Sequence, residues 1–208
     1  MDNVSDLDEK LKRERQINEK DAKTILLQIV SGLKYLNTPG DSTDDNGKSI
    51  KAIIHYDLKP ANILFDENGD VKITDFGLSK IIQDNDDDDA SSLELTSQGA
   101  GTYWYLPPEC FVKGDAPARI SSKVDVWSVG VIFYQMLYGR RPFGEGKTQE
   151  RVLSEGIILN ATQVEFPNDV KAPKVSDEAK DLIRACLTHD QNYRLEVFAL
   201  CAHQYFKK

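Results

Sequence analysis

The chain has little cysteine, no excess of positive charge and no long apolar run. Its three cysteines are odd in number and lack metal-like pairing, which is typical of a reducing intracellular compartment. The net charge is −8 and the basic residues are scattered, so we expect no direct binding to nucleic acid. No stretch approaches the ~18 apolar residues that a membrane span needs, and no signal peptide opens the chain, so we expect a soluble protein without membrane contact.

What the chain does contain is a dense run of polar groups. Residues 55–62 read His-Tyr-Asp-Leu-Lys-Pro-Ala-Asn, and Asp-Phe-Gly follows at 75–77. Between them, residues 63–73 hold two apolar runs around an Asn-Gly pair, which favours a tight hairpin that brings Asp75 beside Asn62. Phosphoryl transfer from ATP requires metal ions, a cation and a group that holds the attacking hydroxyl. The candidates for these roles are Asp57, Lys59, Asn62 and Asp75.

Each of these four side chains also has an ordinary structural interpretation. Asp57 could form a turn, Lys59 could be a solvated charge, Asn62 could form an Asx-turn and Asp75 could cap an element. No packing requirement asks for this order and spacing together. The joint pattern therefore favours phosphoryl transfer.

The pattern resembles the catalytic loop of protein kinases, expected here at 55–62. The resemblance implies that Asp57 is the base that accepts the substrate hydroxyl proton, and that Asn62 and Asp75 hold Mg²⁺. It also implies that Lys59 contacts the γ-phosphate of ATP, as in Ser/Thr kinases. The implied cofactors are therefore ATP and Mg²⁺.

Residues 101–109 resemble the end of a kinase activation segment, which is expected to span 75–109 and to shape the platform for a peptide substrate. The resemblance implies that Thr102 helps to fix the geometry of Asp57 and Lys59. It further implies a structural ion pair between Glu109 and Arg194.

Other parts of the chain agree with this resemblance. Residues 126–137 are apolar on nearly all faces, which predicts a buried helix with Ser122 as its cap. Asp125, at the start of that helix, is implied to hydrogen-bond the catalytic-loop backbone. Nucleotide contacts are implied for Asp6 and Leu64, although for Asp6 a helix-start charge is an equal alternative. An apolar stripe between Ile25 and Leu36 predicts a long core helix capped by Asn18.

Longer strings resemble the Tousled-like serine/threonine kinases over nearly the whole chain. They are Tyr56 in place of the usual Arg, residues 95–111, 123–130 and 138–144. The resemblance implies a nuclear kinase linked to chromatin assembly and chromosome segregation, with substrates of the histone-chaperone type. Family members dimerise through upstream coiled coils, and this chain is expected to be monomeric.

Some features depart from the family pattern. Ala61 replaces a Gly, and residues 38–49 form a polar insertion that is expected to be a solvated surface loop, with adaptor binding as the alternative. Tyr56 cannot grip an activation-loop phosphate as Arg does, so activity should not depend on phosphate capture there. The acidic run at 84–89 is either a solvated charge run or a partial replacement for phosphate.

The expected fold is the mainly helical (α+β overall) large lobe of a kinase, a helical bundle with short β-hairpins at the catalytic cleft. The sequence contains no Gly-rich loop and no strand lysine of the Val-Ala-Ile-Lys type. Residues 1–208 are therefore expected to be a partial kinase domain with the small lobe absent and with little activity alone. A truncated module that only binds substrates or partners, and a phosphotransferase acting on non-protein substrates, are the alternatives.

Overall fold

A computed structural model of the chain describes residues 5–40, 43, 47, 49–83, 92–95, 99–114, 117–168 and 172–207. Within these residues the α-helices are α1 (Leu7–Glu14), α2 (Glu19–Leu36), α3 (Lys123–Tyr138), α4 (Gln149–Ser154), α5 (Asp177–Cys186) and α6 (Val197–Cys201). The strands are β1 (Ile50–Ile54), β2 (Ile63–Phe65), β3 (Val71–Ile73), β4 (Lys80–Gln83), β5 (Leu93–Glu94) and β6 (Arg119–Ile120). Short 3₁₀ helices are η1 (Pro60–Asn62), η2 (Tyr103–Tyr105), η3 (Pro108–Phe111) and η4 (Gln204–Phe206).

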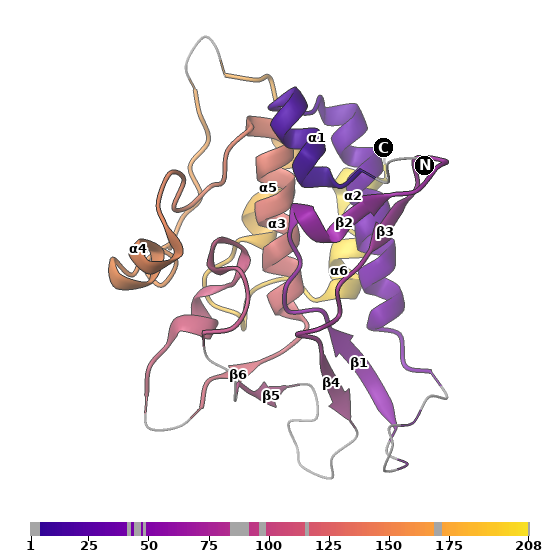
Figure 1. Cartoon of the computed structure of the whole chain (residues 1–208), viewed down its shortest axis with the longest axis vertical. Coiled ribbons are helices and arrows are strands. Elements are labelled where there is room, and N and C mark those ends of the chain that lie inside the picture. Colours follow the sequence, from indigo (N-terminus) through magenta and orange to yellow (C-terminus); the bar gives the residue numbers. More distant parts are fainter. Residues whose placement is uncertain are drawn as a thin grey trace.

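The core forms around α3, which lies at the centre of the helices in Figure 1 and packs against α2, α5 and α6. Nearly every residue of α3 is buried, as its apolar sequence predicts. Gly130 permits the close approach of α5, since a Cβ there would lie 2.7 Å from the Cβ of Cys186. The predicted stripe in α2 is buried except for Leu36, which is half-buried. The Asn18 side chain caps that helix by accepting from Asp21 N at 3.0 Å. Ser122 occupies the N-cap of α3 but makes no side-chain cap bond.

The described strands form three two-stranded antiparallel sheets. The β2–β3 pair is the predicted hairpin, and Gly69 supplies the positive φ of 81° that its turn needs. In contrast, β1 pairs with β4, and β5 pairs with β6, across long stretches of sequence. In Figure 1 the β1–β4 and β5–β6 pairs lie below the helices.

The predicted fold class is therefore wrong in its account of the strands. It placed only short hairpins at the cleft and no small lobe, whereas the described residues contain a sheet-containing region, β1–β6. The β1–β4 and β5–β6 pairings are nonlocal, so no turn residues in the sequence predict them. The expectation of an absent small lobe was based on the missing Gly-rich motif. The absence of a motif does not show that strands are absent.

A second, smaller apolar cluster links these strands to the residues before α3. It contains Ile54, Tyr56, Ile82, Leu95, Leu106, Cys110, Ile120 and Val124. Its members come from β1 and the loop after it, β4, β6, η3, the start of α3 and segments of 75–109. Burial therefore adds to the β1–β4 pairing in holding part of the expected activation segment against β1. Among the described residues, no helix combines the length and apolar character needed to cross a lipid bilayer.

Candidate functional site

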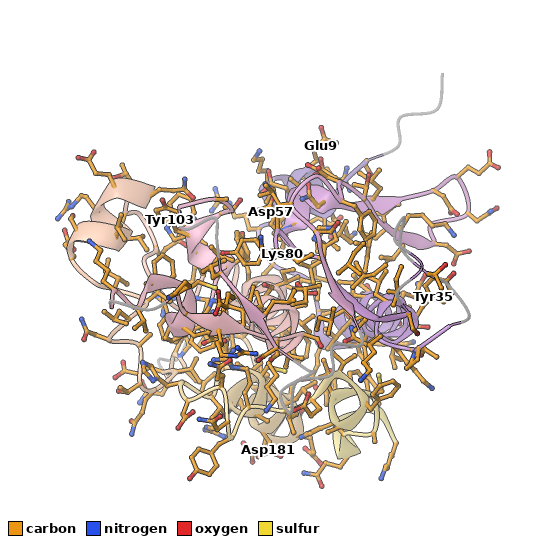
Figure 2. The ribbon with its side chains drawn as sticks, turned by 90° about the horizontal axis from the view of Figure 1, so that it is seen from below. Glu9, Tyr35, Asp57, Lys80, Tyr103 and Asp181 are labelled. Carbon is orange, nitrogen blue, oxygen red and sulfur yellow. The ribbon has the colours of Figure 1, made fainter. Side chains whose placement is uncertain are left out.

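The candidate site is built on the loop between β1 and β2. Residues 55–59 leave β1, and η1 returns the chain into β2. Asn62 Nδ2 donates to the backbone oxygen of Asp57 at 2.9 Å and lies 3.4 Å from its Oδ2. Both side chains are buried, and Figure 2 shows Asp57 on the side of the molecule opposite Asp181. The loop thus folds back on itself and fixes the Asp57 carboxylate.

Asp57, Lys59 and Thr102 meet in a closed set of contacts. Lys59 Nζ lies 2.6 Å from Asp57 Oδ2 and donates to Thr102 Oγ1 at 3.0 Å. Thr102 Oγ1 in turn donates to Asp57 Oδ1 at 2.8 Å. Thr102 is separated from Asp57 by 45 residues, so the expected activation segment closes onto the expected catalytic loop here. An acceptor and a cation held side by side can receive a hydroxyl proton and attract a phosphate.

Asn62 and Asp75 lie at neighbouring ends of the β2–β3 hairpin. Thr74 N donates to Asn62 O at 3.0 Å, which places the following residue, Asp75, beside that strand start. The Asn62 amide nitrogen is used on Asp57, so its amide oxygen is the end that a cation could approach. The Asp75 side chain is exposed, and its Oδ1 accepts a long hydrogen bond of 3.3 Å from Gly77 N.

This donor set fits Mg²⁺ in the way that kinases bind it. Mg²⁺ takes one or two protein oxygens and completes its shell with phosphate oxygens and water. The described residues contain no cluster of three or more His, Cys, Asp or Glu side chains that could hold a metal without a nucleotide. Asn62 and Asp75 therefore suit a metal that arrives with its phosphates.

His55 joins the two halves of the site, a role that the sequence reading did not assign. Its Nε2 lies 2.9 Å from Thr74 O, and its ring meets Phe76 edge-on with centroids 4.8 Å apart. His55 has no exposed surface. Its place at the head of the 55–62 run was the signal that could have identified it. The contacts bind the backbone on both sides of Asp75 to the loop that carries Asp57.

Asp125 is fully buried and holds the backbone of the same loop. Its Oδ2 accepts from His55 N at 2.7 Å and its Oδ1 accepts from Tyr56 N at 2.9 Å. Tyr56 has a φ of 69°, a conformation that non-glycine residues rarely adopt. The two bonds therefore stabilise a strained turn immediately before Asp57. Burial raises the pKa of Asp125 to about 6, although both N–H bonds act to lower it.

This raised pKa predicts a pH effect at Asp125. From about pH 6 down to its ordinary 3.8, the carboxyl is protonated in the folded chain but ionised in the unfolded chain. Its contribution to the free energy of unfolding therefore falls as pH rises through that window. Carbon-13 NMR of the Asp125 carboxyl should give a midpoint near pH 6, and a midpoint near 3.8 would contradict this assignment. Below the midpoint the neutral carboxyl accepts the two backbone N–H bonds less strongly, so we expect a looser loop before Asp57 without loss of fold.

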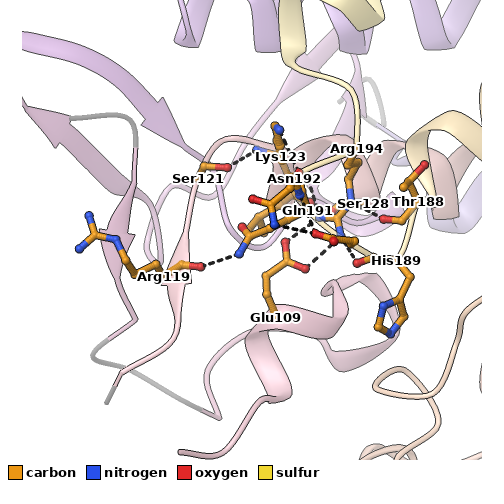
Figure 3. A network of polar contacts seen from close by, with 12 residues as sticks. Glu109, Arg119, Ser121, Lys123, Ser128, Thr188, His189, Gln191, Asn192 and Arg194 are labelled. Atoms are coloured by element: carbon orange, nitrogen blue, oxygen red, sulfur yellow. Dashed lines mark hydrogen bonds and ion pairs between the residues drawn. The ribbon is translucent and has the colours of Figure 1, made fainter. Parts of the chain in front are cut away.

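Glu109 and Arg194 form a buried bidentate pair (Figure 3). Arg194 Nη1 lies 2.6 Å from Glu109 Oε1, and Nη2 lies 2.9 Å from Oε2. The guanidinium also donates to the backbone oxygens of Thr188, His189 and Lys123 and stands over the Trp127 ring at 5.0 Å. The pair therefore connects the end of the 75–109 segment to α3 and to the turn before α6.

The two residues implied to contact the nucleotide, Asp6 and Leu64, lie at the start of α1 and in β2. Asp6 is the N-cap of α1, and its Oδ1 accepts from Glu9 N at 2.7 Å. This is the helix-start alternative for Asp6. Leu64 is half-buried in β2 and forms an isolated bridge with Asp6. The two residues are therefore neighbours in the fold.

Two predicted features fall largely or wholly outside the described residues. In the 38–49 loop, Thr43 and Ser49 form an isolated bridge, and residues 41, 42, 44–46 and 48 are not described. The acidic run at 84–89 lies outside the described residues altogether. Both interpretations therefore stay predictions.

Comparison with known proteins identifies a family and relatives that this chain resembles. The sequence profile described as "Protein kinase domain" matches residues 1–206. The chain is 56% identical over 200 residues to the serine/threonine-protein kinase TOUSLED of Arabidopsis thaliana, covering 96% of this chain and 27% of that protein. It is 53% identical over 205 residues to tousled-like 2 of Homo sapiens, covering 97% and 25%. The chain thus spans about a quarter of the length of these relatives.

The extent of the profile match also corrects the expectation of an absent small lobe. The match runs through nearly the whole chain rather than through a part of it. Together with the sheet-containing region β1–β6, this finding overturns that part of the predicted fold class.

Proposed function

Because the chain belongs to the protein kinase family and has Tousled-like serine/threonine kinases among its relatives, we propose that it transfers the γ-phosphate of ATP to serine or threonine hydroxyls of proteins. The observation that carries the proposal is the contact between Asp57, Lys59 and Thr102. This contact brings the 55–62 loop and the 75–109 segment together around the Asp57 carboxylate and the Lys59 ammonium group.

Asp57 is proposed as the residue that orients the substrate hydroxyl and takes its proton. Its carboxylate is buried, and its Oδ1 and Oδ2 are held by Thr102 and Lys59, so it has a fixed direction. Lys59 stands within reach of the same point and would offset negative charge on the phosphate being transferred. Thr102 is proposed as a positioning residue, because its hydroxyl bridges the other two.

Asn62 and Asp75 are proposed to hold Mg²⁺, which when bound offsets charge on the ATP phosphates. Asn62 presents its amide oxygen because its nitrogen is fixed on Asp57. Asp75 is kept in place by the His55 contacts to Thr74 and Phe76 on either side of it. Both groups are oxygen donors, as this hard cation prefers.

The finer role is proposed from the resemblance to Tousled-like kinases. We place the protein in the nucleus, in processes linked to chromatin and chromosome segregation, acting on substrates of the histone-chaperone type. Dimerisation through coiled coils is proposed only for longer forms that contain them. The chain's acidic character, a net charge of −8, supports contact with chromatin through proteins rather than through DNA.

We also propose that the 208-residue chain alone transfers phosphate weakly. Its sequence has neither the Gly-rich loop nor the strand lysine that cover and grip the ATP phosphates in kinases. A lysine at ~4 Å from a phosphate contributes on the order of 4 kcal/mol at an effective dielectric of about 20. The proposed site residues act at the γ-phosphate, but they supply little of the binding energy that the Gly-rich loop and the strand lysine give to the ATP phosphates.

A nucleotide-binding experiment tests the proposal without relying on turnover. Mg²⁺-ATP at about ten times its Kd should stabilise the chain by about 1.4 kcal/mol, a rise of about 3–6 °C in Tm for a chain of this size. Asp75→Asn should abolish the rise, because it removes the metal's charged ligand. Asp70→Asn is the matched control, since it removes an exposed carboxylate from the same hairpin. A full shift in Asp75→Asn would refute the metal role, and no shift in the parent chain would refute nucleotide binding.

A further inference from the structure

Gln149 forms a hydrogen bond next to the candidate site from a helix that lies outside the core. It is the first residue of α4, which stands to one side of the helices around α3 in Figure 1. Its Oε1 accepts from Tyr103 N at 2.8 Å across 46 residues of sequence. Tyr103 directly follows Thr102, whose hydroxyl bridges Asp57 and Lys59. One side chain of α4 therefore holds the backbone one residue away from the site.

The Tyr103 amide needs a partner because it opens the short helix η2. The first N–H groups of a helix have no acceptor within it, and a side chain at the N-cap ordinarily supplies one. Thr102 is the N-cap of η2 and makes no side-chain cap bond. Its hydroxyl is instead used between Asp57 and Lys59. Gln149 thus gives η2 the acceptor that Thr102 does not provide.

A second set of contacts fixes the start of α4 against η2. Trp104 Nε1 donates to Gly144 O at 3.1 Å, and the Arg141 guanidinium stands over the Trp104 ring at 4.3 Å from its centre. Gly144 has a φ of 64°, and a Cβ there would lie 3.1 Å from Trp104 Cδ1, so the two segments approach closely. The Thr148 side chain caps α4. Gln149 is half-buried and therefore projects towards η2 from a fixed point.

We propose that Gln149 is a positioning residue for phosphate transfer, an inference that rests on the proposed function. By holding the Tyr103 amide it fixes Thr102, and through Thr102 it fixes the Asp57 carboxylate and the Lys59 ammonium group. Figure 2 shows Tyr103 and Asp57 on the same side of the molecule. Gln149 itself acts only through this chain of contacts and touches no reacting atom.

The effect of Gln149 should fall on the transfer step rather than on nucleotide binding. The proposed Mg²⁺ ligands, Asn62 and Asp75, are held by contacts that lie within residues 55–77. Removing the Gln149 acceptor leaves the amide next to Thr102 without its bond, so the turn that carries the hydroxyl can shift. A misplacement of about 1 Å near the reacting groups can cost about 10²-fold in rate.

Phosphate transfer by the full chain, measured with radiolabelled ATP so that slow turnover is visible, tests this role. Gln149→Leu removes the acceptor but keeps most of the bulk, and it should lower kcat about 10–100-fold with an unchanged KM for Mg²⁺-ATP. Gln149→Glu keeps an acceptor oxygen at the same reach and should restore the rate of the parent chain. Glu150→Leu is the matched control, because it introduces the same residue at the next, exposed position of α4 and should leave kcat unchanged.

A spectroscopic readout on the same variants does not need turnover. The carbon-13 signal of the Asp57 carboxyl responds to the bond from Thr102. It should shift in Gln149→Leu and stay at the parent position in Gln149→Glu and Glu150→Leu. The two failures are then distinguishable. A parent chain that transfers no phosphate refutes the proposed function, whereas an unmoved Asp57 signal in Gln149→Leu refutes positioning by Gln149.

The kinetic results can also overturn the inference. Equal kcat in Gln149→Leu and the parent chain, or a loss that Gln149→Glu does not restore, would contradict the role of the acceptor. If Gln149→Leu does not fold, Gln149→Asn replaces it, since its amide is one methylene shorter and cannot keep the 2.8 Å bond in place. A parental rate in Gln149→Asn would then refute the proposal.

Discussion

Asp57→Asn is expected to slow phosphate transfer by about 10²–10⁴-fold, the range that a positioned general base contributes. The substitution keeps the size of the side chain and its ability to accept from Thr102, but it removes the negative charge beside Lys59. Folding should change little, because the substitution removes one ion pair whose Lys59 side chain is partly exposed to solvent. Loss of rate with an intact fold is the signature of a group that acts on the reacting hydroxyl.

The assay needs a form of the chain with measurable turnover. A fusion that supplies a Gly-rich loop and a strand lysine from a Tousled-like relative is compared with the 208-residue chain, by following phosphate transfer to a serine-containing protein. Asp181→Asn is the matched control, since Asp181 lies on the far side of the molecule from Asp57 in Figure 2. Equal rates for Asp57→Asn and the parent would exclude the base role. Fast turnover by the 208-residue chain alone would refute the proposal that it is weak.

Sequence reasoning worked best where one short segment determines geometry. The Asn-Gly pair at the tip of the β2–β3 hairpin announced that turn, and the hairpin brings Asp75 back towards Asn62. The apolar character of α3 also predicted its burial correctly, because a helix that is buried on all sides has few polar residues. These features depend on neighbours in the chain and on no distant partner.

It worked less well where distant segments pair. In the β1–β4 sheet, Ile54 pairs with Lys80. In the β5–β6 sheet, Leu93 pairs with Ile120, and η2 and η3 lie between these two strands in the sequence. Strands of two to five residues carry little periodicity, so their partners are set by tertiary packing. The link from His55 to Thr74 and the bond from Arg119 to Ser92 belong to the same class. They follow from pairing and could not be derived from spacing.

Glu109→Ala is expected to be the most destabilising of the substitutions considered, at about 3–5 kcal/mol, because it leaves the buried Arg194 without its counter-charge. Glu109 is 8% exposed and Arg194 is 2% exposed, so water cannot replace the lost carboxylate. For a chain of this size the expected fall in Tm is about 6–20 °C. The three backbone oxygens that also accept from Arg194 keep part of its hydrogen bonding, which favours the lower half of this range.

Two companion variants separate charge from contact at this site. Glu109→Gln keeps the shape of the side chain but removes its charge. Its free energy of unfolding should therefore lie between that of the parent chain and that of Glu109→Ala. Glu14→Ala is the surface control, since its pair with Lys10 at 2.8 Å is partly exposed and should contribute only about 0.2–0.5 kcal/mol. Thermal and urea unfolding measure all three. If Glu109→Ala proves no more destabilising than Glu14→Ala, then the Glu109–Arg194 pair does not secure the end of the 75–109 segment, and the burial of Ile120 and Leu95 must hold it instead.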